Sequence, residues 1–202
     1  MGIVFHEDHY KDYCRQISEH DLSSIKDTLG IELQDESAIV PLFGEEYLVS
    51  GKGITDKSGN RPGYLICVVL AKYLLLCPQA PSVNEEWSTL TDLNSQFTNV
   101  NVFKSDAERP IIQSFTGKVN ALIEAAGKLG CKPSKMDTIY DVSMEINALP
   151  KIKILLLFND GDEEFPASTS ILYQRHAGEY LDPESLIMIG MTFTKLLKTL
   201  AE

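Results

Sequence analysis

The chain lacks an excess of positive charge. Its 202 residues include 29 acidic and 18 basic side chains, which gives a formal net charge of −11 at pH 7. Nucleic acids and anionic lipid surfaces are bound by broad basic faces, because lysine and arginine neutralise their phosphates. We therefore expect the protein to bind neither nucleic acid nor membranes.

A long apolar run is also missing. The longest run, residues 64–77, has 14 residues and includes Lys72, whereas a membrane-spanning helix needs about 20. This run is typical of a buried helix. The first residues, MGIVFHEDHYKDYC, do not show the basic start and apolar stretch that direct export. We expect the protein to be cytoplasmic.

Closely spaced cysteines are absent. The four cysteines, Cys14, Cys67, Cys77 and Cys131, form no Cys-x-x-Cys pair. Cytosolic cysteines are normally reduced, and metal sites usually have short ligand spacings. The pattern therefore disfavours a metal site built from these residues, and we expect Cys67 and Cys77 in the core.

Common catalytic signatures are missing as well. The chain contains no Gly-x-Ser-x-Gly, no His-Glu-x-x-His and no dinucleotide-binding glycine pattern. A glycine-rich stretch, residues 51–63, precedes an apolar helix and carries Lys57 and Arg61, but its residue order is not that of a phosphate-binding loop. We interpret it as a connecting loop, and the sequence indicates no cofactor.

Apolar residues at spacings of three and four predict four to five helices. Asp21 and Gly30 suit the start and end of one helix, because a carboxylate accepts from free backbone amides and glycine tolerates a left-handed ending. Asp182 and Pro183 suit the start of the last helix. The expected helices cover residues 6–18, 22–29, 64–77, 110–129 and a C-terminal segment that begins at residue 182.

Apolar alternation and turn residues predict antiparallel hairpins. The expected pairs are residues 38–42 with 46–50 around a turn at 43–45, and residues 141–149 with 152–158 around Pro150 and Lys151; residues 170–173 are a further strand. Helices before, between and after antiparallel strands indicate an α+β fold. We expect one or more antiparallel sheets of hairpins, packed with the helices in a single compact domain over residues 1–202.

Four carboxylates follow the second hairpin, in the segment Asn-Asp-Gly-Asp-Glu-Glu at residues 159–164. Hard cations prefer oxygen ligands, so Asp160, Asp162 and Glu163 are candidate metal ligands. The spacing is not that of an EF-hand, and Asp-Gly between strands is a strong turn signal. We favour a hairpin turn and keep a cation site as the alternative.

A basic pair, Arg175 and His176, follows the strand at residues 170–173. We expect the pair to fold back toward the acidic segment, as a salt bridge or as a ligand clamp. Arginine can hold a carboxylate or phosphate, and histidine can act as a base near neutral pH. The candidate ligand-binding residues are Asp162, Glu163, Glu164, Arg175, His176 and Trp87, the only tryptophan, in a segment (residues 78–102) expected to cover the core.

Three stretches, PLFGEEYLV, WSTLTDLNSQF and GDEEFPASTSILYQRHAGEYLDPESL, resemble a family of uncharacterised domains from anaerobic bacteria and archaea. The resemblance spans most of the chain, with landmarks at residues 42–47, 64–77, 87–97 and 161–166. Some relatives resemble fusions to a four-cysteine iron–sulphur module of corrinoid and one-carbon proteins, a module that this chain lacks. The resemblance implies an anaerobic redox or one-carbon setting and assigns no catalytic residue.

These observations lead to three hypotheses. We favour a non-catalytic accessory module that binds a cofactor, a small molecule or a partner protein. The alternative is a metal-dependent enzyme with ligands from residues 160–164 and His176 as acid or base. In the third, the acidic segment only caps the sheet, and an exposed apolar patch forms a homo-oligomer.

Overall fold

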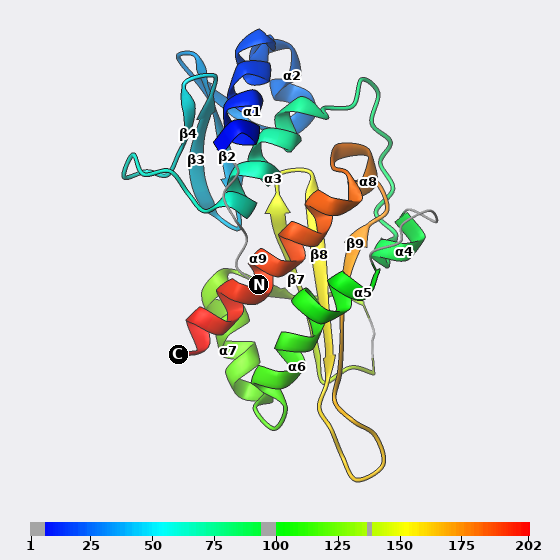
Figure 1. The fold of residues 1–202 in the computed structure, drawn as a ribbon. Coiled ribbons are helices and arrows are strands. Elements are labelled where there is room, and N and C mark those ends of the chain that lie inside the picture. The colour runs from blue at the N-terminus through cyan, green and yellow to red at the C-terminus, as the bar shows by residue number, and fades with distance from the viewer. Residues whose placement is uncertain (1–6, 94–99, 137–138) are drawn as a thin grey trace.

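The computed structural model describes residues 7–93, 100–136 and 139–202 (Figure 1). Its strands form two antiparallel sheets, which confirms the predicted α+β class. The first sheet has the order β1 (Glu32–Gln34), β2 (Ser37–Leu42), β3 (Glu45–Ser50) and β4 (Gly53–Thr55). The second has the order β5 (Trp87–Ser88), β9 (Ser168–Gln174), β8 (Ile152–Asn159), β7 (Val142–Leu149) and β6 (Lys132–Pro133).

The helices come before, between and after these strands. Several are single turns that follow one another in the segment between the two sheets. In chain order they are α1 (Glu7–Glu19), α2 (Leu22–Leu29), α3 (Tyr64–Leu75), α4 (Leu90–Leu93), α5 (Val100–Phe103), the π-helical turn η1 (Lys104–Glu108), α6 (Arg109–Phe115), α7 (Val119–Leu129), α8 (Ala177–Tyr180) and α9 (Pro183–Ala201). None of the described helices is long and apolar enough to cross a membrane.

The predicted helix starts are confirmed by their caps. The Asp21 carboxylate accepts from the backbone amide of Ser23 at 3.0 Å, and Gly30 ends α2 in the left-handed conformation. The Asp182 carboxylate accepts from the amide of Ser185 at 2.8 Å at the start of α9. Each cap satisfies an amide that has no partner within its helix. Residue 6, the expected start of the first helix, lies outside the described residues.

The helix expected at residues 110–129 is interrupted, so this prediction is wrong in one detail. α6 ends at Phe115, Gly117 adopts a positive φ of 72°, and α7 starts at Val119. The apolar spacing continues across the break because both helices bury one face, with Phe115 on the first and Leu122 on the second fully buried. Periodicity alone therefore cannot detect the turn between them.

Both predicted hairpins are present. β7 and β8 pair in antiparallel register, with Asn147 opposite Lys153. β2 and β3 join through Phe43 and Gly44, which both have positive φ, a conformation that matches the twist of a tight hairpin. The amide of Phe43 donates to the carbonyl of Ala148 at 2.9 Å, so this turn meets the end of β7 and joins the two sheets.

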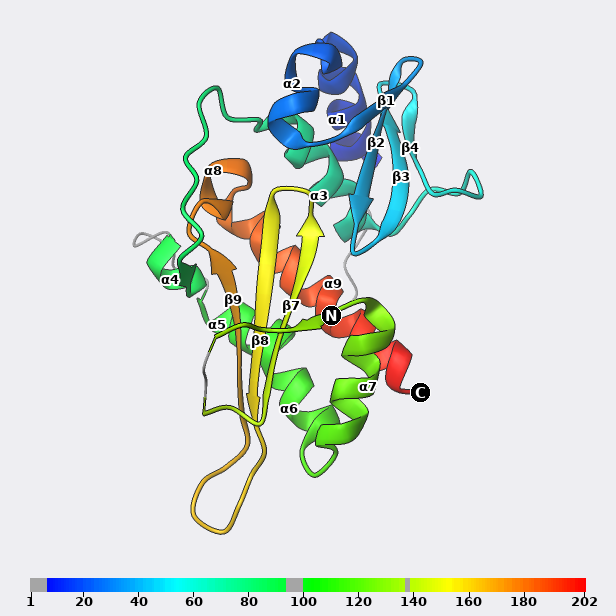
Figure 2. The same cartoon turned by 180° about the vertical axis from the view of Figure 1, so that it is seen from behind.

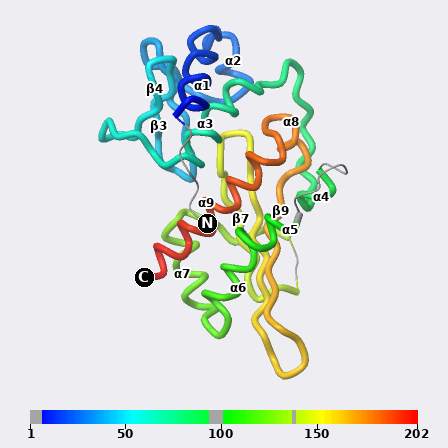
Figure 3. The backbone as a smooth tube through the Cα atoms, viewed as in Figure 1, coloured from blue at the N-terminus to red at the C-terminus, as the bar shows by residue number. Residues whose placement is uncertain are grey.

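α9 crosses one face of the second sheet (Figure 1), and Ile189 and Phe193 are fully buried beneath it. The opposite face is visible from behind, where the chain that follows α7 crosses it (Figure 2). The backbone tube shows the connection between β8 and β9 extending beyond the other elements (Figure 3). The segment expected as an irregular cover, residues 78–102, contributes β5 and α4, while its residues 94–99 lie outside the described chain. The two ends of β9 are thus exposed to different surroundings.

Candidate functional site

The acidic segment lies in the connection between β8 and β9, where its aspartate carboxylates accept hydrogen bonds from backbone amides. Asp162 Oδ1 accepts from the amides of Glu164 at 2.8 Å and Phe165 at 2.6 Å. These hydrogen bonds, that from Phe165 above all, hold the pKa of Asp162 below its usual value. The Asp160 carboxylate accepts from the amide of Gly117 at 2.8 and 3.1 Å. Both aspartates therefore stabilise turns.

The same segment does not gather metal ligands. Glu163 and Glu164 are exposed to solvent. In the part of the chain that the structure describes, no group of three or more histidine, cysteine, aspartate or glutamate side chains is arranged to hold a metal ion. The structure thus shows Asp160 and Asp162 in turn contacts, and it offers no observation that favours the metal-dependent enzyme.

Arg175 and His176 lie at the other end of β9, so the expectation that they fold back toward the acidic segment is wrong. β9 is extended from Ser168 to Gln174, and at 3.3 Å per residue its two ends are about 20 Å apart. The Arg175 guanidinium instead lies 3.6 Å from the Glu86 carboxylate. The basic pair and the acidic segment are close in sequence, but the extended strand between them adds about 3.3 Å for each residue.

His176 joins two segments that are far apart in the chain. Its Nδ1 lies 2.7 Å from the carbonyl oxygen of Asn84, and its Nε2 lies 3.1 Å from the carbonyl oxygen of Lys151. A neutral imidazole can donate to only one of these acceptors, whereas the protonated ring donates to both. The ring of Tyr180 packs edge-on, with centroids 6.0 Å apart. Both ring nitrogens of His176 are therefore engaged by the main chain.

The first of these segments is the strap, which we define as residues 82–88. Glu179 accepts hydrogen bonds from the amide of Ser82, at 2.8 Å, and from the Ser82 hydroxyl. These contacts, the hydroxyl first, lower the pKa of Glu179. Further along, the amide of Arg175 donates to the Glu86 carbonyl at 2.8 Å, and Trp87 pairs with Gln174 as part of β5. α8 and β9 thus fix the strap along its length.

A cleft of about 250 Å³ lies between the strap and the hairpin of β7 and β8. We call it the His176 cleft. Asn147, Lys153, Gln174 and Tyr180 line it together with His176. A second groove of about 360 Å³, which reaches Lys132 and Glu145, shares Asn147 and Lys153 with it. The two hollows therefore adjoin along the end of the second sheet.

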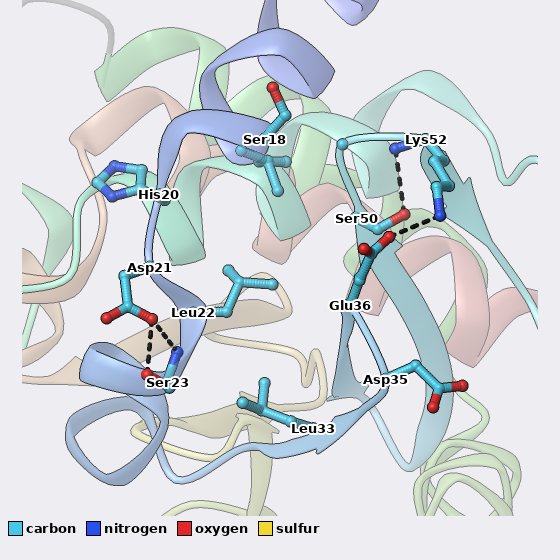
Figure 4. A pocket seen from close by; sticks show the side chains of 12 residues that line it. Ser18, His20, Asp21, Leu22, Ser23, Leu33, Asp35, Glu36, Ser50 and Lys52 are labelled. Atoms are coloured by element: carbon cyan, nitrogen blue, oxygen red, sulfur yellow. Dashed lines mark hydrogen bonds and ion pairs between the residues drawn. The ribbon is translucent and has the colours of Figure 1, made fainter.

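A larger cavity, about 530 Å³, lies elsewhere, where the junction of α1 and α2 faces the first sheet (Figure 4). Several of its polar groups are already paired with one another. Asp21 binds Ser23, and Lys52 Nζ donates to Glu36 at 2.6 Å. The side chains drawn do not converge on a common point (Figure 4). Size alone therefore does not make it the better candidate site.

The structure brings together only part of the predicted site. Arg175, His176 and Trp87 lie at or beside the cleft, and Asp162, Glu163 and Glu164 lie at the far end of β9. Asn147, Lys153 and Gln174 were not among the predicted site residues. A two-residue turn at Pro150 and Lys151 would place Ala148 opposite Lys153. A register irregularity between Asn147 and Leu149 brings Asn147 there instead, so the predicted hairpin did not indicate it.

Fold and cleft together define an α+β domain with a polar cleft at one end of its larger sheet. The chain belongs to the family described as a domain of unknown function (DUF3786), whose model matches residues 21–196. This finding confirms the resemblance to an uncharacterised family. No curated protein and no solved structure matches the chain.

Proposed function

We propose that the chain is a non-catalytic module that binds a small molecule in the His176 cleft. The observation that supports this proposal is the lining of the cleft. Side chains from β7, β8 and β9 face one hollow that the strap closes on one side. Enclosed hollows with a few converging polar groups are the usual form of ligand sites.

The contacts of the polar groups favour binding over catalysis. A general base needs a ring nitrogen within reach of the proton that it removes, and both ring nitrogens of His176 face carbonyl oxygens. The Ser82 hydroxyl, a potential nucleophile, donates to the Glu179 carboxylate rather than to the imidazole. Neither side chain has the partner that would activate it for attack on a substrate.

The proposed setting follows from the resemblance to domains of anaerobic bacteria and archaea. We place the module in the cytoplasm, as an accessory to redox or one-carbon metabolism, where it presents a bound small molecule to a partner protein. The negative charge of −11 is consistent with partners other than nucleic acid. A homo-oligomer is compatible with this role.

A thermal-shift screen with a blocking variant tests the proposal. Compounds of negative, neutral and positive charge are added to the wild type, to Asn147→Trp, which fills the cleft, and to Ser168→Trp. Ser168 is an exposed strand residue at the far end of β9 and serves as the matched control. A ligand at 100 times its Kd stabilises by about 2.7 kcal/mol, which corresponds to roughly 5–10 °C for a domain of this size.

The expected result is a compound that raises the Tm of the wild type and of Ser168→Trp but not that of Asn147→Trp. The proposal is contradicted if no compound of any charge raises the Tm. It is equally contradicted if the shift persists in Asn147→Trp, because the compound then binds outside the His176 cleft.

A further inference from the structure

Three polar side chains stand side by side across one face of the second sheet. Asn147 on β7 lies opposite Lys153 on β8. The register of β8 and β9 pairs Ile154 with Tyr173, and its continuation by one residue places Gln174 opposite Lys153. Residues directly opposite in neighbouring strands project to the same face. We call Asn147, Lys153 and Gln174 the polar row, and all three line the His176 cleft.

Gln174 is the most informative member of the row. The residue is only 7% exposed and lines the cleft. Among the described residues, the fully buried side-chain polar atoms without a partner are the hydroxyls of Ser88 and Ser143, so the Gln174 carboxamide is not one of them. An amide at the wall of a cleft can donate to a ligand there in place of water.

Lys153 supplies the charge of the row. Its Nζ lies 3.7 Å from the Glu145 carboxylate, and the two side chains are 34% and 21% exposed. This separation is longer than that of a charge-assisted hydrogen bond. The ammonium has three donors, so it can bind a further oxygen without losing a short contact.

Lys151 plays a different part. Its main chain forms a wall of the cleft through the carbonyl that faces His176. Its ammonium lies beside Gly30, at the carboxyl end of α2. A Cβ atom built on Gly30 would be 3.6 Å from the Lys151 Nζ. The dipole of a helix favours a cation at that end. Lys153 is therefore the cation that a ligand in the polar row would meet first.

We infer that the ligand of the His176 cleft is a small organic acid whose carboxylate binds the polar row, with Lys153 as counter-ion and the amides of Asn147 and Gln174 as donors. The inference deepens the proposed function and rests on it. A carboxylate monoanion matches the single cation of the row. A phosphate dianion would also face Glu145 and Glu85, which lie along the same two hollows, with too little positive charge.

Matched pairs of acids and amides test this inference. Benzoate and benzamide, and propionate and propionamide, have nearly the same shape but differ in charge; inorganic phosphate is the third probe. Binding to the full chain is measured by calorimetry and thermal shift. We expect each acid to bind at least about tenfold more tightly than its amide, as the loss of a charge-assisted hydrogen bond implies.

Two variants test whether residues of the polar row determine the affinity for benzoate. Lys153→Gln is expected to weaken benzoate binding at least about tenfold, while Lys195→Gln, at an exposed lysine of α9, leaves it unchanged. Gln174→Met removes the carboxamide at nearly constant volume. It is expected to weaken benzoate binding, because the carboxamide is one of the proposed donors.

The outcomes separate this inference from the proposed function. If the amides bind as tightly as the acids and Asn147→Trp still blocks them, the binding module stands and the carboxylate inference falls. The inference also falls if phosphate binds more tightly than benzoate, if Lys153→Gln has no effect, or if Gln174→Met leaves benzoate binding unchanged. If no probe and no compound of the wider screen binds, both proposals fall together.

Discussion

The two ends of β9 use polar residues in opposite ways. At the acidic end, Asp160 and Asp162 accept hydrogen bonds from backbone amides and so fix the turns around them. At the other end, Asn147, Lys153 and Gln174 line a cleft. The acidic end is prominent in the sequence, and the cleft end is not.

The comparison shows that a polar residue indicates a site by its place and its contacts rather than by its charge. A carboxylate that accepts hydrogen bonds from backbone amides already stabilises the fold. An amide or ammonium at the wall of a cleft can still donate to a ligand. Contacts, and not composition, therefore distinguish the end of β9 that stabilises the fold from the end that we propose to bind a ligand.

The largest expected effect on stability is at His176, which joins the strap to the hairpin of β7 and β8. His176→Ala removes the contacts to the carbonyls of Asn84 and Lys151. Losing the hydrogen bonding between the ring and these carbonyls gives an expected loss of about 1–3 kcal/mol, measured as the free energy of unfolding in urea. His20→Ala, at an exposed histidine, is the control and should change little. Equal losses in both variants would contradict the joining role of His176.

A smaller effect is expected at the acidic end. Asp160→Ala removes the acceptor of the Gly117 amide in the turn between α6 and α7. Because this contact is exposed, we expect a loss of about 0.5–1 kcal/mol, again by urea unfolding. Binding of benzoate should be unchanged, since the variant lies a strand length from the cleft. A weakened affinity would mean that the two ends of β9 act as one site.

The smallest effect concerns Glu108, which faces β9 between the two ends. Its carboxylate accepts from the amide of Ile171 at 3.1 Å. Burial raises the pKa of Glu108, and this hydrogen bond opposes part of the rise. A folded-state pKa above the unfolded value means that the charged form costs stability at neutral pH. That cost falls as the pH drops through the folded pKa and vanishes below the unfolded value of about 4.3.

Glu108→Gln is therefore expected to stabilise the protein at pH 7 by up to about 1 kcal/mol. The difference in the free energy of unfolding between this variant and the wild type should disappear as the pH falls toward about 4. Unfolding in urea across this pH range measures it, with Glu32→Gln at an exposed residue of β1 as the control. A variant that is less stable than the wild type at pH 7 would show that the charge of Glu108 is needed.

Much of the fold could be predicted because its signals are local. The caps at Asp21 and Asp182 and the turn at Phe43 and Gly44 each depend on a few neighbouring residues. The break at Gly117 was missed because apolar spacing continues on both sides of it. Local rules thus predict where elements start better than where a continuous pattern is interrupted.

The candidate site was harder to predict because it is assembled across strands. The hairpin alone would pair Lys153 with Ala148, and the irregularity in β7 that brings Asn147 opposite Lys153 has no signal in the sequence. Gln174 required the register of β9, which depends on the length of the connection after Asn159, and no sequence rule gave that length. Charge drew attention to residues 160–164, whereas the grouping of Asn147, Lys153 and Gln174 at one cleft is visible only in three dimensions.

The central claim is that the cleft end of β9, and not the acidic end, binds the ligand. Amide chemical shifts of the full chain, recorded during a titration with benzoate, test it most directly. We expect saturable changes at Asn147, Lys153 and Gln174, with the shifts of residues 160–165 unchanged. Changes confined to residues 160–165, or none that saturate near the polar row, would contradict it.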